Sequence, residues 1–85
     1  MAKYSDSIET DKAYEAYVEA VTRCTDPVER LRLCRAQLVV ERDRFAAKGR
    51  RLRKAEKKEV MTYCVERMES AIAFVDGEIA RIGGN

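Results

Sequence analysis

Residues 46–58 read AAKGRRLRKAEKK, and this basic stretch separates two long segments with helical periodicity. Seven of the eleven residues from Lys48 to Lys58 are lysine or arginine, and only Glu56 opposes them. Gly49 is of the type that commonly follows the last turn of a helix, so we expect a turn over residues 49–53. The stretch therefore predicts the tip of an antiparallel helical hairpin.

Both arms of this hairpin carry apolar residues at helical spacing. The first arm is expected over residues 27–48, because Asp26 can cap it and Pro27 suits its first turn. Its main apolar stripe consists of Val28, Leu31, Cys34, Leu38 and Phe45. The second arm is expected over residues 54–82 and ends before Gly83. These patterns predict two long helices that pack along their apolar stripes.

A third helix is expected before the hairpin, over residues 7–23. Asp6 would be its N-cap, and Glu9 stands in the capping-box position three residues later. Its apolar face is shallow and consists mainly of alanine and tyrosine. The predicted fold is therefore all-α, with a long antiparallel hairpin and a shorter N-terminal helix packed across it in a single domain, residues 1–85.

The apolar face of the second arm is wider than the first arm can cover. We therefore expect the N-terminal helix to pack against it and a second copy of the chain to cover the rest. Small domains often need such a partner, because their cores bury little surface. The sequence predicts a homodimer, with self-association through Val65, Met68, Ile72, Val75 and Ile79.

Charge is segregated along the chain. Residues 1–29 contain three basic and seven acidic side chains. Residues 30–58 contain twelve basic and three acidic side chains, and residues 59–85 contain two basic and five acidic ones. The net charges of the three segments are therefore −4, +9 and −3. Two interpretations fit this pattern: the basic segment is an interaction surface, or it lies between two acidic helices that neutralise it.

Catalytic chemistry has little support in this composition. The chain has no histidine, and no base stands beside the three cysteines, Cys24, Cys34 and Cys64. Cys34 and Cys64 lie on apolar stripes and read as small buried side chains. We predict no enzymatic activity, cofactor, metal site or small-molecule substrate. Unpaired cysteines and a polar N-terminal segment favour the cytoplasm, and no segment is apolar enough to predict a membrane contact.

The remaining function classes are binding functions. The favoured hypothesis is a protein–protein interaction module (an adaptor, chaperone, assembly factor or inhibitor) that contacts an acidic partner through the tip. The alternative is nucleic-acid binding through the same side chains, although no aromatic residue stands between Arg50 and Lys58 to stack on bases. The predicted contact residues are Arg42, Arg44, Lys48, Arg50, Arg51, Arg53, Lys54, Lys57 and Lys58.

Overall fold

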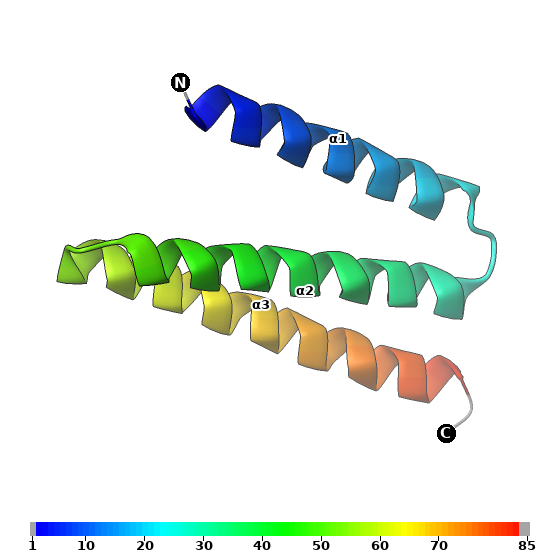
Figure 1. Ribbon diagram of the computed structural model, residues 1–85. Coiled ribbons are helices and arrows are strands. Elements are labelled where there is room, and N and C mark those ends of the chain that lie inside the picture. The colour runs from blue at the N-terminus through cyan, green and yellow to red at the C-terminus, as the bar shows by residue number, and fades with distance from the viewer. Residues whose placement is uncertain (1, 84–85) are drawn as a thin grey trace.

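The computed structural model describes the backbone of residues 2–83 and the side chains of residues 12–83. The described chain forms three helices without a strand: α1 (Ala2–Arg23), α2 (Pro27–Arg51) and α3 (Ala55–Ile82). Helices α2 and α3 form an antiparallel hairpin, and the shorter α1 folds back along α2 (Figure 1). The predicted all-α fold and its hairpin are confirmed.

The three helices lie side by side in one layer. The Cα atoms extend over 45 × 25 × 11 Å, so the molecule is only one helix thick. Helix α1 contacts α2 near the corner that joins them and diverges from it toward the N-terminus (Figure 1). Within the described residues α1 does not contact α3, so the expected packing of the N-terminal helix on the third helix is wrong. The physical reason is that α2 lies between them.

The seam between α2 and α3 contains the core. Among the described residues only Ile72 and Val75 of α3 are buried, with 7% and 6% of their surface exposed. Half-buried apolar side chains of both helices surround them. Across the seam, Arg35 donates two hydrogen bonds to Asp76, with Nε–Oδ1 and Nη2–Oδ2 distances of 2.5 and 3.3 Å. Apolar burial along one seam therefore joins the two helices, and an exposed ion pair bridges them.

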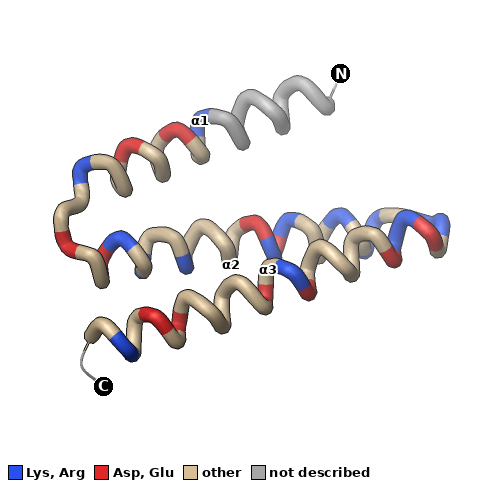
Figure 2. The backbone as a smooth tube through the Cα atoms, turned by 180° about the vertical axis from the view of Figure 1, so that it is seen from behind, with Lys and Arg blue, Asp and Glu red and all other residues tan. Residues whose placement is uncertain are grey.

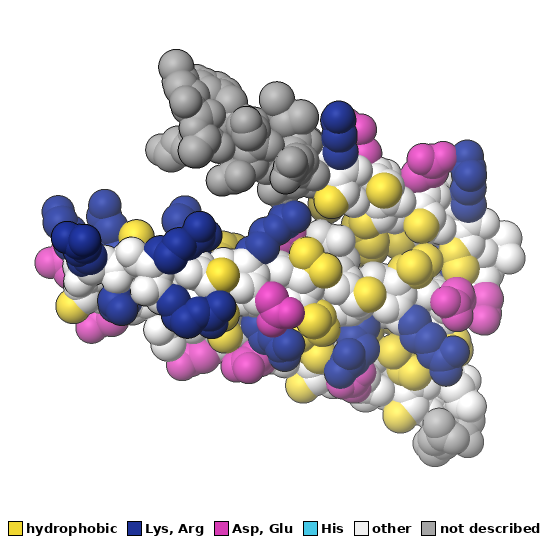
Figure 3. All heavy atoms as spheres, in the orientation of Figure 1, with side chains coloured by type: hydrophobic (Ala, Val, Ile, Leu, Met, Phe, Trp, Pro, Cys, Tyr) yellow, Lys and Arg dark blue, Asp and Glu magenta, His cyan; other side chains and the backbone are white. Residues whose placement is uncertain are grey.

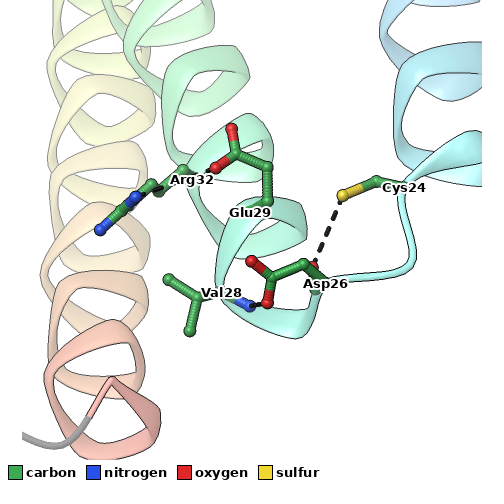
Figure 4. A network of polar contacts seen from close by, with 5 residues as sticks. All are labelled: Cys24, Asp26, Val28, Glu29 and Arg32. Atoms are coloured by element: carbon green, nitrogen blue, oxygen red, sulfur yellow. Dashed lines mark hydrogen bonds and ion pairs between the residues drawn. The ribbon is translucent and has the colours of Figure 1, made fainter.

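A short linker forms the corner between α1 and α2. The Asp26 carboxylate accepts a hydrogen bond from the backbone N–H of Val28 at 3.2 Å, which confirms the predicted N-cap, and Pro27 begins the helix. The Cys24 thiol donates to the Asp26 carbonyl at 3.5 Å (Figure 4). From α2, Arg30 Nε donates to the Val21 carbonyl at 3.2 Å, near the end of α1. The bond from Val28 satisfies a backbone N–H that the start of α2 leaves without a helical partner, and the other two bonds add to carbonyls that already accept from backbone N–H groups.

Tyr17 of α1 contacts α2 away from the corner between the two helices. Tyr17 is half-buried, whereas its neighbour Tyr14 is exposed, and their ring centroids lie 5.9 Å apart. Burial, and then contact with the Cys34 thiol of α2, raises the pKa of Tyr17. Tyr17 therefore packs its ring against α2, as expected for the alanine and tyrosine face of α1.

Two predicted helix boundaries differ from the structure. Helix α1 begins at Ala2 and not near Ser7, so Asp6 lies within the helix, and its side chain and that of Glu9 fall outside the described residues. Helix α2 continues through Gly49 to Arg51, and the loop is residues 52–54.

Gly49 has a packing role in place of the predicted helix-ending role. A Cβ atom at this position would lie 3.2 Å from Cβ of Met61 on α3. The missing side chain therefore lets the two helices approach closely just before the loop. Gly77 of α3 is different, because no atom lies within 4 Å of a Cβ placed there.

This contrast gives a matched pair of substitutions. Gly77→Gln should raise the free energy of unfolding by about 0.5–1 kcal/mol, since glutamine favours the helix over glycine. Gly49→Gln should lower it by up to roughly 2.5 kcal/mol, because pushing Met61 aside costs more than the same gain in helix propensity returns. Urea denaturation followed by circular dichroism measures both. Equal stabilisation by the two variants would show that α2 and α3 do not approach closely at Gly49.

Candidate functional site

The closed end of the hairpin carries an exposed group of cations, which we call the basic tip. It combines side chains from the last turn of α2, the loop and the first turn of α3. All of its members are exposed, and none forms an ion pair with any side chain of residues 12–83. Figure 2 shows them clustered at one end of the elongated molecule. The basic tip consists of Lys48, Arg50, Arg51, Arg53, Lys54, Lys57 and Lys58.

Two predicted contact residues are set apart from this cluster. Arg42 and Arg44 lie further down α2 and are half-buried. Arg42 pairs with Asp43 at 3.2 Å, and Arg44 pairs with Glu41 at 3.1 Å. Because acids of the same helix already balance these guanidinium groups, they add less to the field of the tip than its unpaired members do.

Local helix electrostatics do not explain the basic tip. Cations suit the C-terminal end of α2, where the helix dipole is negative, but they oppose the positive N-terminal end of α3. Lys54 occupies the N-cap position of α3 and makes no side-chain capping hydrogen bond. Glu56 is the one acidic residue of the first turn of α3. Lys54, Lys57 and Lys58 therefore lie where positive charge disfavours α3, while the cations of α2 lie where it is favourable.

The predicted self-association residues divide into two groups. Ile72 and Val75 are buried inside the hairpin seam, so their side chains are unavailable to a second copy. Val65, Met68 and Ile79 are half-buried along the same seam. For these three, self-association stays a prediction.

Other apolar side chains are more exposed than the predicted ones. Val60, Tyr63 and Phe74 of α3 are 55%, 61% and 69% exposed. At 100° per residue they share one side of α3, turned away from the seam. On the face seen in Figure 3, hydrophobic side chains gather toward the corner of α1 and α2, while Lys and Arg gather toward the tip. The periodicity of Val60, Tyr63 and Phe74 was the available signal for this second stripe.

The described residues offer few groups for other chemistry. Cys24, Cys34 and Cys64 are half-buried free thiols. No group of three or more metal-ligating side chains occurs among residues 12–83. Within the described part of the chain, no helix combines the length and apolar character needed to cross a membrane.

No protein-family model matches the chain, and neither a curated protein nor a solved structure matches it significantly.

The uncapped end of α3 predicts a gain in stability from removing a lysine. Lys54→Ser should raise the free energy of unfolding by about 1 kcal/mol, because serine can cap the helix. Lys57→Ser, which removes the same charge inside the first turn, should give no comparable gain. Thermal denaturation of the two variants and the native chain tests this. Equal gains would mean that charge removal, and not capping, is responsible.

Proposed function

We propose that this protein is a non-enzymatic interaction module that binds the acidic surface of a partner protein through its basic tip. The main support is that the seven cations of the basic tip lack acidic partners. They are exposed at one end of the molecule, and none forms an ion pair with any side chain of residues 12–83. Unpaired like charges repel one another, and an anionic partner relieves that repulsion. Such a surface also speeds encounter with an acidic partner.

Two features favour a protein over a nucleic acid as the partner. Exposed acids, Glu56 and Glu59, stand among the cations, and a protein surface can supply lysine or arginine side chains to pair with them, whereas a phosphate backbone cannot. The basic tip also contains no aromatic side chain, whereas sequence-independent binding of single strands uses aromatic stacking. A mixed surface with excess positive charge suits a protein surface with excess negative charge.

Fluorescence anisotropy with a labelled polyglutamate peptide tests this function. Replacing Arg51, Arg53, Lys54 and Lys57 with glutamine should weaken binding by roughly fourfold or more, since each lost exposed pair contributes about 0.2–1 kcal/mol. Binding by the native chain should weaken steeply with added salt. The matched control replaces four exposed cations elsewhere with glutamine: Lys12, Arg23, Arg32 and Arg67.

The same titration with duplex DNA and a structured RNA separates the two partner classes. Tip-dependent binding of polyglutamate that exceeds binding of either nucleic acid supports the proposal. Tighter tip-dependent binding of DNA or RNA would replace it with the nucleic-acid function. Equal loss of binding in the tip and control variants would show that net charge alone is responsible.

The proposed module also pairs with a second copy of itself. Its accessible surface is 6671 Å², whereas a folded monomer of 9.7 kDa exposes about 5,100 Å². The excess, about 1,500 Å², exceeds the roughly 800 Å² that each partner of a standard interface buries. A single layer of helices leaves apolar side chains without cover, and a second copy would cover them.

The exposed apolar side chains of α3, Val60, Tyr63 and Phe74, offer a test of dimer formation. Phe74→Glu should shift the protein from dimer toward monomer and leave its helix content unchanged, because Phe74 is 69% exposed. Ala73→Glu places the same charge about 100° around the helix and should have a smaller effect. Sedimentation equilibrium over a range of concentrations measures both. A native chain that remains monomeric at the highest concentration would refute the pairing.

A further inference from the structure

An apolar groove lies between α2 and α3 next to the basic tip. Its volume is about 360 Å³, and Phe45 of α2 and Met61 and Val65 of α3 line it. These three side chains are half-buried, so part of their apolar surface remains open to solvent. Ala46 and Gly49 also line the groove. Gly49 lies close against Met61, whereas Ala46 has too little side chain to fill the space beside Phe45.

Cations from both helices line the same groove. Arg50 comes from the last turn of α2, and Lys58 comes from α3, one turn after its start. Both side chains are exposed, and neither pairs with an acid among residues 12–83. An apolar surface between two unpaired cations differs from the rest of the basic tip, which offers charge alone.

We propose that this groove binds an apolar side chain of an acidic amphipathic segment in the partner protein. The anchor would be a leucine or phenylalanine, and neighbouring Asp or Glu residues would pair with Arg50 and Lys58. This proposal rests on the function proposed above and specifies the chemistry of its partner. Grooves between helices commonly take one apolar face of a partner helix in this way.

The volume and the charge pattern together select this occupant. About 360 Å³ is at the lower end of ligand-binding hollows, enough for one or two large side chains. A phosphate backbone would pair with the two cations and leave the apolar surface of Met61 and Val65 in water. An uncharged apolar segment would cover that surface and leave the cations unpaired. Only a segment with both characters satisfies both parts of the groove.

Three labelled peptides of equal length test the proposal by fluorescence anisotropy. The first has leucines at helical spacing among glutamates, the second replaces the leucines with serine, and the third replaces the glutamates with glutamine. Burial of one leucine should make the first peptide bind about tenfold more tightly than the second. The third should bind more weakly than the first, and its binding should not depend on salt.

A variant that fills the groove tests whether the preference for the leucine peptide arises there. Ala46→Leu should remove most of the preference for the leucine peptide and leave binding of the serine peptide unchanged. Ala73→Leu is the matched control, because Ala73 is exposed on α3 and does not line the groove. Circular dichroism establishes that each variant is folded. If Ala46→Leu does not fold, the peptide series with the native chain still decides the question.

The outcomes separate this inference from the proposed function. Equal binding of the leucine and serine peptides overturns the groove proposal and leaves the acidic-partner function standing. No binding of any acidic peptide refutes both. Equal binding of the glutamine peptide shows a purely apolar site and overturns the proposal. Tighter binding of a duplex DNA, unaffected by Ala46→Leu, also overturns it in favour of nucleic acid.

Discussion

Apolar burial along the seam between α2 and α3 is the interaction on which the rest of the structure depends. The two side chains buried in the described chain, Ile72 and Val75, both lie there. The close approach at Gly49 and the ion pair from Arg35 to Asp76 depend on the same alignment of the helices. Among the described residues, helix α1 contacts α2 and not α3, and none of its side chains from Lys12 to Arg23 is fully buried. The hairpin is thus the stable unit, and it holds both the groove and the basic tip in place.

Much of this architecture can be predicted from the sequence, because helix ends and apolar faces depend on local patterns. Asp26 and Pro27 mark the start of α2, and Gly83 marks the end of α3, as the structure confirms. Which helix packs against which, by contrast, does not depend on local sequence. Periodicity shows that α3 has a wide apolar face, but it cannot show that α2 separates it from α1. For the same reason, Gly49 resembles a helix terminator until its distance to Met61 is known.

The candidate site, too, is predictable from the sequence only in part. The run of cations is plain in the sequence, but its division into paired and unpaired members is a property of the folded chain. Asp43 beside Arg42, and Glu41 three residues before Arg44, were the local signals that those two arginines are balanced. Burial of Ile72 and exposure of Phe74, two residues apart on the helix, follow from the side of α3 that meets α2. Such a distinction requires the packed structure.

The loop at the basic tip has a consequence for how the molecule folds. Only residues 52–54 separate α2 from α3, so the first contacts of the seam form between residues close in sequence. Closing so short a loop loses little chain entropy, and proteins dominated by such local contacts fold in microseconds to milliseconds. The seam can then extend from the tip toward Val75 turn by turn. The cations of the basic tip repel one another at this first step, so the charge at the tip opposes the start of the hairpin.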